Sequence, residues 1–581
     1  MGPGSQAVLW RTLAAAILAC GIECAARSVA TLPYAPRARD IVLLTGLYVL
    51  AAIPALLAVR RRRLSRVLAG LPFGLLGANL AFALGLGVAG ARSALVVAAL
   101  LGTGCGVVVL SAPTAILLAG LVLCVATSSI SIARGPAHGP ATTGANVLLI
   151  VLDTTTAGHL SAYGYARPTS PNLEALARRG VLYRRAISAA PWTIPSHASI
   201  FTGRYPSELG FDGAQFDFDP AVGSIAADFR AAGGGTAAIT ANVAVRATPE
   251  LAFGFDGMWD EWRLTRPAPE RALYRMLGWG VNQSRGERIT ELALDWVDRL
   301  SPAGRPWLLF LNYLDPHAPY APPPAERRRF APDVRPGWVP PPNELFTAGL
   351  VPLTSEIRDA IPELYDGEVA AMDRAVGRLL RELGRRGYDE NNLIVVVTAD
   401  HGESLGEHGV LGHELGLPEQ VLHVPLLIAG PGVRPAEIGE PVQTLQLRAT
   451  LGALQARPLR ADIAPALPPW GRAPDLIITE HPFPDWFHAD LQRLDPAYDP
   501  TSWRGDWVAL ERDGVKVVFN DHGDGATYDL RADPGEEHPE PFSRGAELVR
   551  AYRGRHLVAS RQHRDLTDAE RSAMRQLGYL R

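Results

Sequence analysis

The chain has 581 residues, of which 20% are charged, and its formal net charge is -3. A chain of this length exceeds what one hydrophobic core supports, so we expect several structural units. The near balance of charge gives no global basic signal of the kind expected for nucleic-acid binding, and we predict no nucleic-acid partner.

Residues 1–135 are rich in Leu, Ala, Val and Gly and almost free of acidic side chains. Their apolar stretches approach the ~20 residues that a helix needs to cross a bilayer, which predicts a transmembrane domain of about five helices. The predicted spans are 8–25, 41–59, 67–89, 94–111 and 113–132. A cleaved signal peptide is disfavoured because several apolar segments follow the first. A buried soluble helical domain is the remaining alternative.

The orientation of these spans is predicted from their arginines. Arg60 to Arg63, with Arg66, lie between the second and third spans, and the positive-inside rule places that loop in the cytoplasm. The weaker cluster Arg27, Arg37 and Arg39 argues the other way. We therefore predict a multi-pass integral membrane protein whose remaining chain lies on the extracytoplasmic side, after a Gly/Pro linker at 136–145.

Apolar strands alternate with amphipathic helices from residue 146 to about 460. This alternation is typical of an α/β sheet covered on both faces, and we predict a doubly wound, mostly parallel sheet. The predicted strands are 146–152, 181–187, 236–241, 306–314, 393–398 and 424–428. The predicted helices are 170–180, 195–202, 286–300 and 355–386.

Two further segments have a different character. The stretch 316–343 is rich in Pro and Arg and predicts an irregular loop, either a lid or a plain surface excursion. Residues 461–581 predict a small C-terminal α+β subdomain. Its predicted strands are 475–479, 506–511, 514–519 and 527–530, with Asp513-Gly514 as a hairpin turn, and its predicted helices are 544–561 and 567–577.

Polar residues that follow the apolar strands indicate where chemistry occurs. Asp153 ends one strand, and Asp400 and His401 end another; in open α/β sheets such residues gather around one crevice. Thr193 lies at or just before a helix N-terminus, because Pro195 suits the first turn. Two carboxylates, an imidazole and a hydroxyl predict one divalent metal, with Zn, Mn, Ca and Mg all open. Helix capping is the alternative for Thr193 and both aspartates.

Three blocks of this sequence resemble the sulfatase family of the alkaline-phosphatase superfamily: NVLLIVLDT at 146–154, TIPSHAS at 193–199 and ADHGE at 399–403. A family-like ending, YDLRADPGE, follows at 528–536. The resemblance implies an alkaline-phosphatase-like fold and a metal site formed by Asp153, Thr193, Asp400 and His401. It also implies that His317 and His413 bind ester oxygens or protonate the leaving group. An ordinary loop histidine is the alternative for each.

The family pattern is broken at the nucleophile. Sulfatases have Cys or Ser there, converted to formylglycine, and Thr193 cannot give that aldehyde. His197 stands where the signature has Arg, and Thr154 where many sulfatases have a second metal-binding Asp. A nucleophilic threonine is instead similar to that of lipoteichoic acid synthases and phosphoethanolamine transferases, which also carry several membrane spans.

These observations predict a membrane-anchored, metal-dependent hydrolase or transferase that cleaves phosphate or sulfate esters outside the cytoplasm through Thr193. The expected substrate is lipid-linked or an envelope glycan. A true sulfatase that uses Thr193 directly is one alternative. A non-catalytic domain that binds anionic envelope polymers is the alternative from another class.

Overall fold

In the computed structural model, the described residues are 144–553, except for 212–216, 243, 246–247, 249, 261–285, 300, 302–303, 458–461, 483–484, 500–504, 521 and 523. Nearly all of them belong to one unit, which comprises Gly139–Glu261, Asn282–Leu294 and Pro302–Arg581. A domain boundary near residue 460 within this unit stays a prediction. The predicted helix at 567–577 lies outside the described residues.

The five predicted membrane spans, between residues 8 and 132, also lie outside the described residues. Within the described part of the chain, no helix combines the length and the apolar composition that crossing a bilayer requires. The membrane anchor and its orientation therefore stay predictions.

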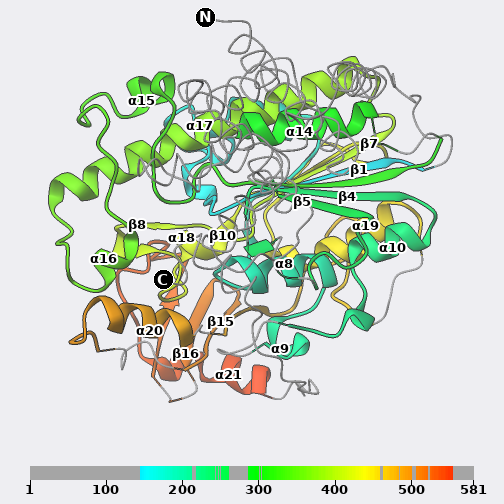
Figure 1. Ribbon diagram of the computed structural model, residues 1–581. Helices are drawn as coiled ribbons and strands as arrows, with labels where there is room; N and C mark the ends of the chain where they lie inside the picture. The colour runs from blue at the N-terminus through cyan, green and yellow to red at the C-terminus, as the bar shows by residue number, and fades with distance from the viewer. Residues whose placement is uncertain are drawn as a thin grey trace, which may run out of the picture. The chain divides into compact units, whose positions relative to one another are not determined.

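An eight-stranded sheet is built from strands between residues 146 and 438, in the order β12-β2-β11-β7-β1-β6-β4-β5 (Figure 1). Its strands are β1 (Asn146–Leu152), β2 (Val181–Tyr183), β4 (Gly235–Thr240), β5 (Gly257–Asp260), β6 (Trp307–Tyr313), β7 (Leu393–Thr398), β11 (Leu426–Ala429) and β12 (Ala436–Ile438). β1, β6 and β7 are fully buried because nearly every residue is apolar, as expected for strands covered on both faces.

Helices cover the two faces of this sheet. The long helix α17 (Ser355–Arg385) lies on one face, and α8 (Thr193–Thr202), α10 (Ile225–Ala231) and α19 (Leu447–Leu454) lie on the other (Figure 1). Further helices are α7 (Pro171–Ala177), α9 (Pro206–Leu209), α14 (Gly286–Arg299), α15 (Pro324–Phe330), α16 (Asn343–Thr347) and α18 (Glu419–Leu422). Short 3₁₀ helices are Ala157–His159, Ser161–Tyr163, Pro220–Val222, Glu407–Gly409, Thr444–Gln446 and Phe542–Gly545.

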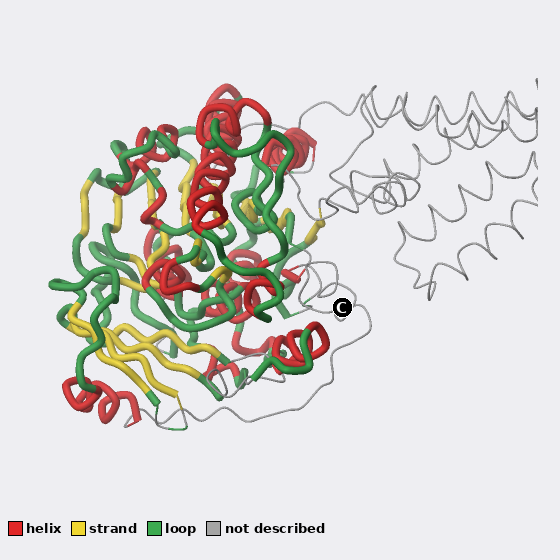
Figure 2. Tube along the Cα trace, turned by 90° about the vertical axis from the view of Figure 1, so that its left-hand side faces the viewer, coloured by secondary structure: helices red, strands yellow, loops and turns green. Residues whose placement is uncertain are grey.

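A four-stranded antiparallel sheet follows near the C-terminus, and its strands lie side by side in Figure 2. It contains β14 (Ile477–His481), β15 (Trp507–Arg512), β16 (Val515–Asn520) and β17 (Gly525–Asp529), with helices α20 (Asp485–Leu494) and α21 (Ala546–Arg553). α21 packs on one face through Leu548 and Val549. The other face contacts Leu417, Val421 and Leu422, which follow the segment that carries Asp400 and His401. The predicted Asp513-Gly514 turn is confirmed, since both residues have positive φ, 55° and 81°.

The structure corrects several predicted elements. β11 runs antiparallel to both β7 and β2, so the sheet is mixed. The predicted strand 181–187 is divided into β2 and β3 (Ala186–Ile187), and β3 joins β10 (His423–Val424) and β13 (Val442–Gln443) in a separate small sheet. The predicted irregular loop at 316–343 contains α15. A short ribbon of β8 (Ser404–Leu405) and β9 (Leu411–Gly412) was not predicted.

Candidate active site

Thr193 is the first residue of α8, a helix buried along its whole length. Trp192 occupies the N-cap position, so the interpretation of Thr193 as an N-cap is wrong. The backbone N–H groups of the first turn have no partner within the helix, and with the helix dipole they favour an anion beside Thr193. The local sequence therefore places a hydroxyl where a phosphate or sulfate group is stabilised.

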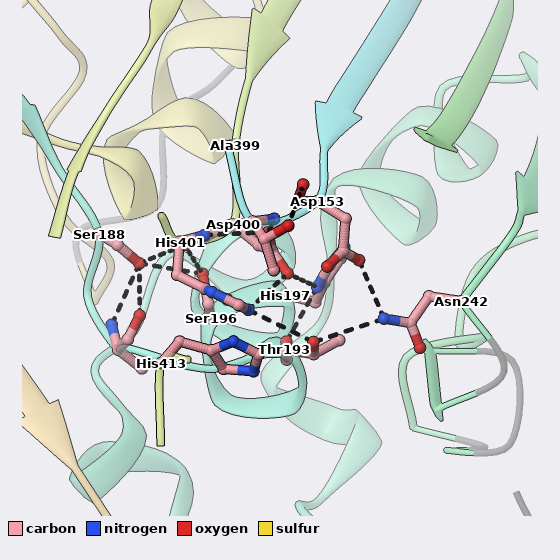
Figure 3. Close-up of polar contacts among 12 residues, drawn as sticks. Asp153, Ser188, Thr193, Ser196, His197, Asn242, Ala399, Asp400, His401 and His413 are labelled. Atoms are coloured by element: carbon pink, nitrogen blue, oxygen red, sulfur yellow. Dashed lines mark hydrogen bonds and ion pairs between the residues drawn. The ribbon is translucent and has the colours of Figure 1, made fainter. Parts of the chain in front are cut away.

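Asp153, Asp400 and His401 come together at the ends of β1 and β7, which are neighbours in the sheet (Figure 3). Each offers one ligand atom, and these atoms all lie within 4.8 Å of one another. All three residues are fully buried. Thr193 adjoins this group, because its Oγ1 lies 3.4 Å from Nε2 of His401.

The protonation pattern of His401 suits a metal ligand. Its Nδ1 donates to the Gly402 carbonyl at 2.9 Å, which leaves the lone pair on Nε2. Burial, reinforced by the charge of His413, lowers the pKa of His401 well below its ordinary value, so the ring stays neutral. The Nε2 atom of His401 lies 3.3 Å from Oδ2 of Asp400. When Asp400 is ionised, two acceptor atoms face each other, an arrangement that a cation between them would stabilise.

The carboxylates also leave room for a cation. Asp153 Oδ1 and Asp400 Oδ2 are buried without a hydrogen-bond partner, which is costly unless a ligand supplies one. Burial, and then the negative charge of Asp153, raises the pKa of Asp400 well above its ordinary value. A divalent ion would compensate both oxygens. The donor set fits Zn²⁺ or Mn²⁺ in ligand type, and the identity of the metal stays open.

Two asparagines that sequence reasoning missed hold Asp153 in place. Asn242 and Asn312 each donate from Nδ2 to Asp153 Oδ2 at 2.9 Å. The other carboxylate oxygen of Asp153, Oδ1, is thereby left as a possible metal ligand. Asn242 Nδ2 also lies 3.4 Å from Thr193 Oγ1. A signal was present in the sequence, because Asn312 is a polar residue inside an apolar strand and Asn242 closely follows β4.

His413 is a cationic side chain beside this group. Its ring packs against that of His401, with 4.3 Å between the centroids, and its Nδ1 lies 3.0 Å from Glu403 Oε1. Burial opposes its charge, but Glu414 and Glu403 outweigh burial and raise the pKa of His413 to about 10. His413 therefore carries a positive charge at neutral pH.

His317 lies on the far side of His413, with 5.6 Å between the ring centroids. It follows β6, as predicted, and only 8% of its surface is exposed. Its Nδ1 donates to the Ala318 carbonyl at 2.8 Å. All six predicted site residues thus lie in one region.

Besides Thr193, two further residues depart from the family pattern, His197 and Thr154, and their surroundings differ. His197 is buried, donates from Nδ1 to the Thr193 carbonyl at 2.9 Å, and lies 3.5 Å from Asp400 Oδ2. Burial lowers the pKa of His197, so a neutral ring stands where the signature has a cation. The Thr154 hydroxyl donates to the Asp153 carbonyl at 2.8 Å and is directed to backbone.

Comparison with known proteins identifies the family. The model of the sulfatase family matches residues 145–455, more than half of the chain. Choline-sulfatase of Rhizobium meliloti is 26% identical over 444 residues, which cover 67% of this chain and 81% of that protein. The ulvan-active sulfatase of Formosa agariphila is 25% identical over 301 residues, which cover 50% of this chain and 56% of that protein.

Solved structures agree on the fold. The phosphonate monoester hydrolase of Agrobacterium radiobacter superposes with a TM-score of 0.54 and 21% identity, and the match covers 71% of this chain and 95% of that one. The range matched by the family model, 145–455, includes the segments that carry Asp153, Thr193, Asp400 and His401. The chain belongs to the sulfatase family and is an ester hydrolase.

Proposed function

We propose that this chain is a membrane-anchored, metal-dependent hydrolase or transferase that cleaves phosphate or sulfate esters outside the cytoplasm, with Thr193 as its nucleophile. One observation carries the proposal: the Thr193 hydroxyl lies 3.4 Å from Nε2 of His401, beside two buried carboxylate oxygens without hydrogen-bond partners.

Asp153, Asp400 and His401 would hold the ion, with Thr193 as an added oxygen ligand. When bound, the ion would lower the pKa of the Thr193 hydroxyl and neutralise charge on the ester. The N-terminus of α8 would stabilise the non-bridging oxygens of the ester. His413, protonated at neutral pH, would neutralise the same oxygens or give its proton to the leaving alcohol.

Threonine at position 193 favours phosphoryl transfer. A formylglycine hydrate carries a second hydroxyl through which a sulfated intermediate collapses, and Thr193 has none. A phosphothreonine can instead be resolved by in-line attack of water or of an acceptor alcohol at phosphorus. The substrate would then be a lipid-linked or envelope-glycan ester, in keeping with the membrane spans predicted at residues 8–132.

A sulfate ester is the second candidate, and the family match favours it. Both relatives described above are sulfatases by name, an ulvan-active sulfatase and a choline-sulfatase. Family membership argues against the third reading, a non-catalytic binder of anionic envelope polymers.

A substrate panel tests these candidates. The full chain, purified in detergent and analysed for bound metal, is assayed with matched aryl phosphate diester, aryl phosphate monoester and aryl sulfate. We expect turnover of a phosphate ester that chelation abolishes and metal restores. Turnover of the aryl sulfate alone would support the sulfatase alternative. Metal-independent activity, or none on all three esters, would contradict the proposal. A reporter fused after residue 150 tests the orientation, because it should be active only outside the cytoplasm.

A further inference from the structure

Asp153, Asp400 and His401 are called the metal-type group below. We propose that Tyr365 is a positioning residue for this group. Its hydroxyl holds Thr154 in a left-handed conformation that sets Asp153 and Asp400 at their observed separation. This inference rests on the proposed metal site. Tyr365 lies on α17 and contacts neither the Thr193 hydroxyl nor the ligand atoms in any recorded hydrogen bond. Its effect is therefore exerted through the backbone.

The Tyr365 hydroxyl bridges two backbone groups that follow Asp153. It donates to the Thr154 carbonyl at 2.7 Å and accepts from the Thr156 N–H at 3.1 Å. Tyr365 is fully buried, and burial raises its pKa well above the ordinary value, so the hydroxyl keeps its proton and can donate. One side chain thus fixes both ends of the turn 154–156.

Thr154 needs such support because its φ is 52°. A β-branched side chain rarely adopts the left-handed region, since its Cβ approaches the backbone too closely. In this conformation the Thr154 N–H is directed to Oδ1 of Asp400 at 3.3 Å. The turn after β1 is therefore hydrogen-bonded to the carboxylate that follows β7, and relaxation of φ would break this connection.

Helix α17 provides a firm base for the hydroxyl. Asp366, the next residue, is buried and accepts from Tyr165 at 2.9 Å and from Arg167 at 2.6 Å. Two turns further, Asp373 accepts from the N–H groups of Asn172 and Leu173 at 3.0 and 2.9 Å. The stretch of α17 that carries Tyr365 is thus bonded repeatedly to the segment 165–173.

The turn also has little room to move. A Cβ added to Gly402 would lie 3.1 Å from the Thr156 Cβ and 2.1 Å from the Gln420 carbonyl oxygen. The backbone after His401 is therefore enclosed between Thr156 and α18. A shift of Thr156 would displace the segment that carries Asp400 and His401, so loss of the Tyr365 hydroxyl should affect all three ligands.

The test measures Zn²⁺ affinity by calorimetry on the metal-free full chain, without reference to activity. Tyr365→Phe keeps the ring and removes the hydroxyl, and we expect Zn²⁺ affinity to fall about 10- to 100-fold, as for other indirect supports of metal ligands. Thr154→Gly should bind Zn²⁺ within about threefold of wild type, because glycine adopts positive φ without strain. In the Thr154→Gly background, Tyr365→Phe should cost less than about threefold, because the turn no longer depends on the hydroxyl.

Tyr183→Phe is the matched control, since it removes another buried hydroxyl, one that donates to the Pro468 carbonyl at 2.5 Å; its Zn²⁺ affinity should equal that of wild type. Wild-type affinity in Tyr365→Phe would overturn this inference and leave the proposed function standing. Equal losses in both backgrounds would also overturn it, because they would indicate lost packing rather than a released turn. A wild-type chain that binds no divalent ion would overturn both.

Discussion

Two buried groups of charged residues in this protein are organised in opposite ways. The first is the metal-type group of Asp153, Asp400 and His401, where Asp153 Oδ1 and Asp400 Oδ2 have no hydrogen-bond partner. The second, the Lys516 cluster, joins Lys516 and Arg185 to three carboxylates. These carboxylates belong to Glu419, Glu511 and Glu536. Both groups remove carboxylates from water, yet only the second supplies its own cations.

The Lys516 cluster is internally complete. Lys516, the only lysine in the sequence, lies 3.0 Å from Glu419 Oε1 and 2.8 Å from Glu536 Oε1, and it donates to the Leu417 carbonyl at 2.7 Å. Arg185 pairs with Glu419 at 2.7 Å and with Glu511 at 2.6 Å. The cluster connects the C-terminal sheet to α18, close to the active-site segment. A complete cluster indicates a structural role, and an incomplete one indicates a missing ligand.

The largest effect is expected on turnover when the hydroxyl beside the metal-type group is removed. Thr193→Ala should reduce turnover by at least about 10⁴-fold, the order of loss on deleting a nucleophile. Metal content and melting temperature should stay near those of wild type, because the two carboxylates and His401 remain. Ester turnover and elemental analysis on the same preparation check this. Unchanged turnover would remove Thr193 from the mechanism.

The next effect concerns the Lys516 cluster. Lys516→Met leaves Glu419 and Glu536 buried without their shared cation, and we expect about 3–5 kcal/mol of unfolding free energy to be lost. Zn²⁺ affinity should change little if this cluster is structural. The control is Arg184→Ala, which breaks the exposed pair with Glu437 and should cost less than about 1 kcal/mol. Thermal unfolding and calorimetry check both effects. A Lys516→Met chain that is as stable as wild type would make the comparison invalid.

The sequence predicts the first group far better than the second. Asp153 and Asp400 follow long apolar strands, and the rule that carboxyl ends of parallel strands share a crevice is sufficient to bring them together. The Lys516 cluster depends on residues from 185 to 536 whose proximity no local pattern encodes. Tyr365 was missed for the same reason, because its partners are backbone groups more than 200 residues away.

The errors in the predicted fold have physical causes. Strand direction is not encoded in an apolar run, so the antiparallel β11 was indistinguishable from its parallel neighbours. β5 is only four residues long and gives too little periodicity to detect. α15 lies in a Pro-rich stretch, yet Pro324 is its first residue, a position that favours proline. The proline at the first helical position was a helix signal, but the high Pro and Arg content of 316–343 favoured the prediction of a loop.

A smaller effect tests the ligand assignment in the metal-type group. Asp400→Asn removes one negative charge from the ligand set, and we expect Zn²⁺ affinity to fall about 100-fold or more. The matched control is Glu480→Gln, another buried carboxylate, which accepts from the Ser207 N–H, the Ser207 hydroxyl and the Tyr552 hydroxyl. That variant should keep the wild-type affinity. Equal affinity in Asp400→Asn and wild type would mean that Asp400 is not a ligand.

The smallest effect is a proton released on metal binding. Burial and Asp153 raise the pKa of Asp400 above its ordinary 3.8, so the metal-free chain retains a proton that an ion must displace. Zn²⁺ affinity should therefore increase with pH until the raised pKa is passed. The metal-free chain should show the opposite trend in stability, because the neutral form of Asp400 stabilises the fold and is lost as pH rises through that pKa.

Calorimetry in two buffers of different ionisation enthalpy counts the released proton directly. We expect protons to be released from the carboxylate pair on binding, with fewer in Asp153→Asn, because burial then raises the pKa of Asp400 without the added repulsion from Asp153. The Lys516 cluster should add no such proton, since its cations already hold Glu419 ionised and keep its pKa below the ordinary 4.5. Identical binding heats in the two buffers would show that the metal-type group is ionised before the ion arrives, and its contrast with the Lys516 cluster would then rest on geometry alone.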